Sequence, residues 1–210
     1  MATLKRTTIT YALILAFVAL ICTLITLAMY ALTQDKIQQV MENQQKQLLS
    51  EVLPPNFANN DLLRSCYIPN NNKQLADISK LYLAKKQNKT VAYLFETSAP
   101  DGYSGNIRIL VAVTPEREVL GVRVLEHHET PGLGDKIETR LSDWILAFSN
   151  KQFNLNELDK WAVKKDGGEF DQFAGATITP RAVVNAVKKG LLQLLSQPFV
   201  FNPDDYSRCN

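Results

Sequence analysis

The sequence has little of what metal sites and hydrolytic enzymes are built from. Its 210 residues include three cysteines and two histidines. No Cys-x-x-Cys pair or Cys/His cluster occurs, so a zinc or iron–sulfur site is not expected. His127 and His128 are adjacent at the end of a predicted strand, where neighbouring side chains point to opposite faces. No Ser/His/Asp or Cys/His arrangement can be assembled either, which gives hydrolysis little support.

An excess of charge of one sign is also missing. The chain has 23 basic residues against 21 acidic ones, and no dense basic run stands out. Nucleic acid is therefore not expected as a partner, because phosphate binding needs a clustered basic face. Internal repeats and low-complexity segments are absent as well. The length suits one globular domain together with an anchor.

One long apolar run is present near the N-terminus. Residues 11–32 carry no charge, and a helix of that length is about 33 Å long, which matches the hydrocarbon core of a bilayer. Thr23 and Thr26 are tolerable there because their hydroxyls can bond back to the preceding turn. A cleaved signal peptide would be shorter and end in a small-x-small site. A core helix of the soluble domain is the other alternative, and it is disfavoured because the segment is apolar all round. The run is therefore predicted to be a retained transmembrane helix.

The charges that flank this run predict its orientation. Lys5 and Arg6 precede it, whereas Asp35, Lys36 and Glu42 follow it. By the positive-inside rule, residues 1–10 lie in the cytoplasm and the rest of the chain lies outside it. In a Gram-negative cell this places a single-pass protein in the inner membrane, with its main domain in the periplasm.

The three cysteines do not form a recognisable set. Cys22 lies within the apolar run and is interpreted as a small hydrophobic residue. Cys66 and Cys209 lie far apart in the polar part of the chain. Outside the cytoplasm they could form a disulfide, but sequence alone does not bring two thiols within bonding distance. Both the paired and the free state stay open.

Residues 33–75 are predicted to form a juxtamembrane helix and a connector. Apolar residues recur at helical spacing as far as Val52, and Pro54-Pro55 then stops the helix. The remainder is predicted to be a connector with asparagine-rich turns at 59–60 and 70–72.

Residues 76–210 are predicted to form an α+β domain. Short alternating strands joined by brief turns indicate an antiparallel meander at 91–95, 107–113 and 119–125. Amphipathic helices are predicted at 137–148 and 180–195. An antiparallel sheet with packed helices follows from this order. Trp144 and Trp161 are assigned to its core.

Two segments depart from ordinary structural sequence. The first, HETPGLG from His128 to Gly134, packs a proline and two glycines behind a strand. Its glycines let the backbone approach a flat ligand closely, although a plain strand-to-helix turn has the same composition.

The second segment is DQFAGATITP, from Asp171 to Pro180. Small residues leave Thr177 sterically open, and Thr179 and Pro180 are predicted as the N-cap and first turn of a helix. A phosphate on the Thr177 hydroxyl would meet the positive end of that helix. Simple helix capping remains the alternative.

Together the two segments resemble a known family. DQFAGAT resembles the flavinylation motif Asp-x-x-Ser/Thr-Gly-Ala-Thr, whose last threonine receives FMN through a phosphoester bond. HHETPGLGDK resembles the flavin-contacting segment in the G subunit of Rnf-type electron transport complexes. It is similar also to the C subunit of the sodium-pumping NADH:quinone oxidoreductase. The resemblance covers essentially the whole chain, and the modest length fits the Rnf family better.

The resemblance implies roles for individual residues. Thr177 is the expected attachment site for FMN, and Asp171 is the acidic position that the modifying flavin transferase requires. Gly175 and Ala176 fit the motif, whereas Ala174 stands where serine or threonine is usual. Further residues expected along the flavin are Tyr103, Ser104, Glu129, Thr130, Pro131, Gly132, Leu133 and Gly134.

The implied function is that of an electron relay with no substrate of its own. Its partners would be the other subunits of a membrane complex that couples ferredoxin–NAD electron transfer to Na⁺ or H⁺ movement. Three alternatives stay open: the equivalent subunit of the quinone reductase, a tethered periplasmic binding or scaffold module without redox activity, and a solitary FMN reductase with reversibly bound flavin.

Overall fold

The computed structural model describes residues 2–69, 75–195 and 206–209, and the chain divides after Gln45 into two compact units. Helix α1 (Ala2–Glu51) makes up the first unit and contributes its last turns to the second. From Ile9 onward it is long and apolar enough to cross a membrane, with a mean hydropathy of 2.8 over its most apolar window. The predicted helix over 11–32 is confirmed, and it ends before Pro54 as expected.

The threonines within the apolar run behave as their chemistry predicts. Thr23 Oγ1 donates to the carbonyl of Ala19 at 2.6 Å, and Thr26 Oγ1 donates to that of Cys22 at 2.5 Å. Large apolar side chains of this segment are exposed within the chain, as Leu15 is at 75%. Such a surface is suited to lipid or to another apolar partner.

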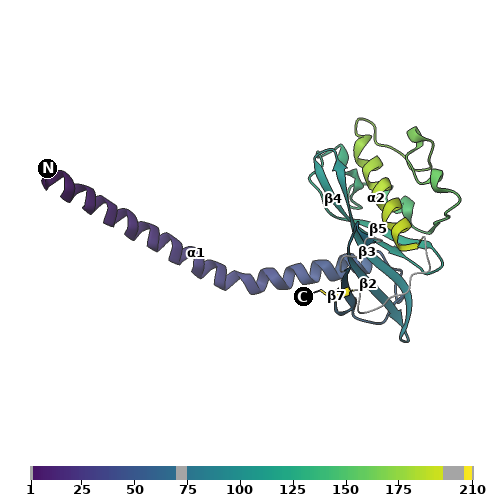
Figure 1. The fold of residues 1–210 in the computed structure, drawn as a ribbon, viewed down its shortest axis with the longest axis horizontal. Coiled ribbons are helices and arrows are strands. Elements are labelled where there is room, and N and C mark those ends of the chain that lie inside the picture. Colours follow the sequence, from purple (N-terminus) through teal and green to yellow (C-terminus); the bar gives the residue numbers. More distant parts are fainter. Residues whose placement is uncertain (1, 70–74, 196–205, 210) are drawn as a thin grey trace. The chain divides into compact units, whose positions relative to one another are not determined.

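The second unit is built on a seven-stranded antiparallel sheet in the order β6-β5-β4-β3-β2-β1-β7 (Figure 1). The strands are β1 (Cys66–Pro69), β2 (Ile78–Lys86), β3 (Lys89–Gly102), β4 (Gly105–Val113), β5 (Glu118–Glu126), β6 (Lys151–Gln152) and β7 (Tyr206–Arg208). The predicted antiparallel α+β architecture is confirmed, and the three predicted strands lie within β3, β4 and β5.

The sheet is buried on both faces because alternate side chains enter two different cores. On β4, Ile109 and Val111 enter the core beneath helix α2 (Ile178–Leu195), which Figure 1 shows packed across the sheet. Leu110 enters the opposite core, together with Leu49 and Val52 from the end of α1. This two-sided burial explains why β3 and β4 each contain an uninterrupted apolar run, over 91–95 and 109–113.

Two predicted elements are wrong in part. The connector predicted at 54–75 contains a 3₁₀ helix (Leu63–Ser65) and then β1, which joins the sheet. The turn predicted at 70–72 lies outside the described residues. The prediction also missed β2, in which a continuous apolar run over 81–84 lies between Lys80 and Lys85.

The amphipathic helix predicted at 137–148 is instead two short 3₁₀ helices, Gly134–Ile137 and Asp143–Phe148. Between them Ser142 is extended, and its hydroxyl accepts from the Trp144 N–H at 3.1 Å. This local side-chain bond starts the second helix afresh and replaces a continuous α-helical ladder. Two further 3₁₀ turns, Leu158–Lys160 and Lys164–Asp166, complete the cover of this face.

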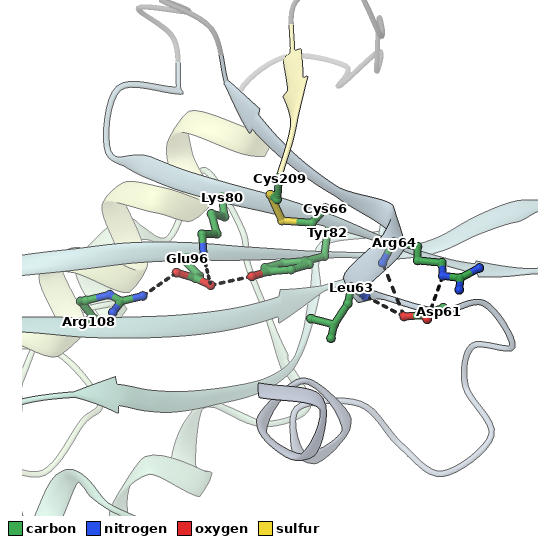
Figure 2. The surroundings of a disulfide bond; sticks show 9 residues. All are labelled: Asp61, Leu63, Arg64, Cys66, Lys80, Tyr82, Glu96, Arg108 and Cys209. Carbon is green, nitrogen blue, oxygen red and sulfur yellow. Dashed lines mark hydrogen bonds and ion pairs between the residues drawn. A yellow bond between two sulfur atoms is a disulfide. The ribbon is translucent and has the colours of Figure 1, made fainter. Parts of the chain in front are cut away.

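A disulfide joins Cys66 of β1 to Cys209, just beyond β7, with 5.4 Å between the Cα atoms (Figure 2). It fastens the C-terminal strand to the edge of the sheet. The question that the sequence left open is answered by strand pairing, because β1 and β7 are neighbours.

Candidate functional site

The two unusual sequence segments meet at one cavity of about 240 Å³. It lies where the β3–β4 turn, the loop after β5 and the start of α2 come together. Its lining consists of Tyr103, Glu129, Thr130, Leu133, Gly134, Gly175, Ala176, Thr177, Ile178 and Thr179. Residues that are far apart in the sequence thus share one small site.

Glu129 connects the three segments of this cavity. Its side chain is buried, and Oε1 accepts from the Ser104 N–H at 3.0 Å. Oε2 accepts from the Thr179 hydroxyl at 2.5 Å. No ion pair among the described residues includes Glu129, so neutral donors alone hold this carboxylate.

The glycines of the loop after β5 serve different purposes. Gly132 has a φ of +77°, which places it in the left-handed region and closes a turn in which the Gly134 N–H reaches the Thr130 carbonyl at 3.1 Å. Gly134 lies against Glu129 and Thr179: a Cβ there would come within 2.6 Å of the Glu129 Oε2. A side chain at Gly134 would therefore force the Glu129 contact apart.

Thr177 is half-buried and stands immediately before α2. Gly175, with a φ of +81°, turns the chain so that Thr177 contributes to the cavity wall. Within the described part of the chain the Thr177 hydroxyl makes no hydrogen bond. The first turn of α2 contains no acidic residue of its own; the carboxylate that reaches it is that of Glu129, which accepts from the Thr179 hydroxyl.

Thr179 does not have its predicted role. The helix begins at Ile178, so Thr179 is inside the first turn and fully buried, and its hydroxyl binds Glu129. The pattern Thr-Pro is typical of a helix start, but a buried carboxylate from a distant loop competes for the hydroxyl. Pro180 does occupy the first turn, as expected.

Three large apolar side chains surround the cavity and are exposed: Tyr103 at 68%, Leu133 at 43% and Ile178 at 44%. They come from the three different segments. An apolar rim around a few convergent polar groups is typical of a site for a flat, partly apolar ligand.

The structure therefore brings together eight of the twelve residues that the sequence proposed for the site, and adds Ile178 and Thr179. Ser104 contributes only its N–H to Glu129, while Pro131 and Gly132 shape the turn. Ile178 had no signal beyond its position next to Thr177.

Asp171 lies outside the cavity. Its side chain is exposed and pairs with Lys164 Nζ at 2.6 Å, and its carbonyl accepts from Trp144 Nε1 at 2.7 Å. Trp161 is buried as predicted, whereas Trp144 is only partly buried and packs against the rings of Phe148 and Phe173. Asp171 is thus accessible to another protein.

Comparisons with known proteins identify the family. The G subunit of the ion-translocating oxidoreductase complex of Pasteurella multocida is 57% identical over 188 residues, which cover 89% of this chain and 93% of that protein. Its counterpart in Haemophilus influenzae strain PittEE is 56% identical, covering 93% of this chain and 94% of that protein. The chain belongs to this family.

Two family models match separate parts of the chain. Residues 1–52 match the RnfG N-terminal region, and residues 102–192 match the FMN-binding domain. The crystal structure of Shewanella oneidensis NqrC is similar over 69% of this chain and 72% of that chain, at 26% identity and a TM-score of 0.45. With the family and helix α1 established, the chain is a membrane protein and its second unit contains an FMN-binding domain.

Proposed function

We propose that this chain carries FMN as a phosphoester on Thr177 and passes electrons within an ion-translocating oxidoreductase complex. The observation that carries the proposal is the Thr177 hydroxyl, which is free of hydrogen bonds to described residues at the edge of the cavity. Members of the family are subunits of an ion-translocating oxidoreductase complex, so the other subunits of that complex are the proposed partners.

The N-terminus of α2 supports a phosphate on Thr177. Backbone N–H groups of the first turn and the helix dipole both favour a negative group next to residue 177. The first turn has no carboxylate of its own, and the Glu129 carboxylate that reaches it is engaged by the Thr179 hydroxyl and the Ser104 N–H. A phosphoester here would thus be stabilised without any basic side chain.

The cavity and its rim support the flavin ring. The volume of about 240 Å³ is below that of most ligand pockets, so the exposed rim of Tyr103, Leu133 and Ile178 would share in holding the group. When bound, FMN supplies one- and two-electron transfer, and the protein sets its potential through hydrogen bonds, charge and burial. Glu129 is the one residue of the cavity lining that carries a carboxyl group.

Attachment requires an activated flavin donor. The Thr177 oxygen would form a new P–O bond while a phosphoanhydride bond in the donor breaks, and the hydroxyl proton leaves with the departing phosphate-bearing group. A flavin transferase would have to recognise the exposed segment around Asp171. The exposure of Asp171 and of the neighbouring Gln172 and Ala174 supports such recognition.

Two features of the chain support the proposed location of the domain. Lys5 and Arg6 precede the apolar run and favour a cytoplasmic N-terminus. The disulfide supports an oxidising compartment for the second unit. We place the chain in the bacterial inner membrane with its FMN domain in the periplasm.

The test is flavin fluorescence from the protein band on a denaturing gel, after co-expression with a flavin transferase. Wild type should fluoresce and Thr177→Ala should be dark, with Thr179→Ala as a neighbouring control that retains some fluorescence. A wild-type band that is dark under every condition would favour a reversible flavin binder or a scaffold module instead.

A further inference from the structure

His127 lies just outside the cavity and touches the loop that forms it. Its Nδ1 accepts from the Glu129 N–H at 3.0 Å, and its Nε2 is 2.6 Å from the Glu138 carboxylate. The side chain is 11% exposed. It also lines a larger open cleft of about 570 Å³ beside the end of α1, where Arg123 pairs with Glu51.

The partners of His127 determine where its proton lies. A backbone N–H can only donate, so Nδ1 must be unprotonated to accept from Glu129. The proton is then on Nε2, where it faces Glu138. Hydrogen bonding from Arg140 is the main cause that lowers the pKa of the Glu138 carboxyl; burial opposes it and the His127 contact adds to it. Glu138 is thus an acceptor that fixes the orientation of the ring.

Glu129 is consequently held from two sides. Thr179 and Ser104 hold its carboxylate, and His127 holds its main chain. We infer that His127 is a positioning residue for the FMN site, because its Nδ1 fixes the Glu129 backbone and so aims the Glu129 carboxylate at the cavity. This inference rests on the function proposed above. Nothing in the sequence distinguished His127 from its neighbour.

That neighbour, His128, is a matched control. It is exposed, and no hydrogen bond joins it to any described residue. Replacing His128 by alanine removes the same type of side chain from the adjacent position without touching Glu129. Any effect specific to His127 must therefore come from its contacts.

Two substitutions separate the contacts of His127. In His127→Asn the amide oxygen can take the place of Nδ1 and accept from Glu129, but the donor to Glu138 is lost. In His127→Gln the amide nitrogen can take the place of Nε2 and donate to Glu138, but the acceptor for Glu129 is lost. Both should be compared with His127→Ala and His128→Ala in the full-length protein.

Amide hydrogen exchange before flavin attachment reads the main-chain contact directly. The Glu129 amide should exchange about five- to tenfold faster in His127→Ala and His127→Gln. It should stay near the wild-type rate in His127→Asn and His128→Ala. Equal exchange in all four variants would overturn the inference.

The midpoint potential of the attached flavin gives the second reading. The potential should rise in His127→Ala and His127→Gln, because a Glu129 carboxylate that is no longer held in place opposes the negative charge of reduced flavin less. In His127→Asn and His128→Ala the potential should equal that of wild type. Rescue by Gln and not by Asn would contradict the assignment. A wild-type protein without covalent flavin would refute the proposed function. The exchange rates of the Glu129 amide would still show whether His127 holds the Glu129 main chain.

Discussion

Two carboxylates are buried among the described residues of the second unit, and their surroundings differ. Glu96, in β3, is 4% exposed and contacts the Tyr82 hydroxyl at 2.7 Å and Arg108 at 3.0 Å, with Lys80 at 3.9 Å (Figure 2). Glu129 is 5% exposed and has only the Thr179 hydroxyl and the Ser104 N–H as partners among the described residues. One charge is balanced by cations, whereas the other is held by neutral dipoles.

Under the proposed function, Glu96 is a structural carboxylate and Glu129 is one that faces a ligand. A buried charge costs several kcal/mol unless it is paired, so Glu96 with its cations is compatible with an ordinary sheet. Glu129 has no cation as a partner among the described residues, and it lines the cavity together with Thr177. Stability and flavin properties should accordingly respond to different residues.

The largest effect on stability should come from the region of Glu96, where the disulfide holds the sheet edge and Cys66 pairs with Tyr82 across β1 and β2. The double change Cys66→Ser and Cys209→Ser should lower the free energy of unfolding by about 2–5 kcal/mol. Urea unfolding would measure this, with Cys22→Ser in the apolar run as control. A loss no larger than that of the control would break the account of this region.

Exchanging the two carboxylates for uncharged residues should separate the effect on stability from the effect on the flavin potential. Glu96→Ala leaves Arg108 and the Tyr82 hydroxyl without their acceptor and should lower the free energy of unfolding by about 2–4 kcal/mol. The partial exposure of Arg108 limits this loss, because water can solvate the unpaired cation. Glu129→Gln preserves shape and should cost about 1 kcal/mol, yet it should raise the flavin potential. Redox titration and urea unfolding of both variants would show whether the effects separate.

Gly134→Ala tests the close approach at the Glu129 site. Because a Cβ would come within 2.8 Å of the Thr179 Oγ1, we expect a loss of about 1–3 kcal/mol together with less covalent flavin. Ala174→Ser is the control, since Ala174 is exposed and serine restores the usual motif residue. That change should stay within about 0.5 kcal/mol of wild type. Full flavin attachment in Gly134→Ala would argue against a tight site.

The smallest effect should be at Glu138, and it should depend on pH. Hydrogen bonding from Arg140 lowers the pKa of Glu138 below its ordinary 4.5. A lowered pKa contributes stability that is fully present above pH 4.5 and is lost as the pH falls through the folded-state value. Unfolding of Glu138→Gln should therefore differ from wild type at pH 7, and the difference should shrink below pH 4.5. A stability difference that grows below pH 4.5 would contradict a lowered pKa for Glu138.

The sequence predicted those parts of the fold in which local pattern and tertiary environment agree. The apolar run, the stop before Pro54, the strands within β3 to β5 and helix α2 all follow from periodicity and turn residues. Helix 137–148 failed because the Ser142 hydroxyl offered the backbone a competing bond. Strand β1 was missed because a four-residue strand following a proline- and asparagine-rich stretch has almost no periodic signal.

For the site, local sequence supplied the residues but not their contacts. The segments around Gly132 and Gly175 were recognisable from small residues and a family resemblance, and both do reach the cavity. The bonds from Glu129 to Thr179 and from His127 to Glu129 depend on how the loop after β5 meets α2. Neither hydrogen bond could be predicted from the spacing of residues along the chain.

The most direct test of the central claim is to locate flavin on the polypeptide by mass spectrometry. Trypsin cleaves after Lys165 and Arg181, so one peptide contains both Thr177 and Thr179. The account predicts that this peptide gains the mass of FMN less one water, and that fragmentation assigns the gain to Thr177. A gain assigned to another residue, or a flavin released intact on unfolding, would contradict it.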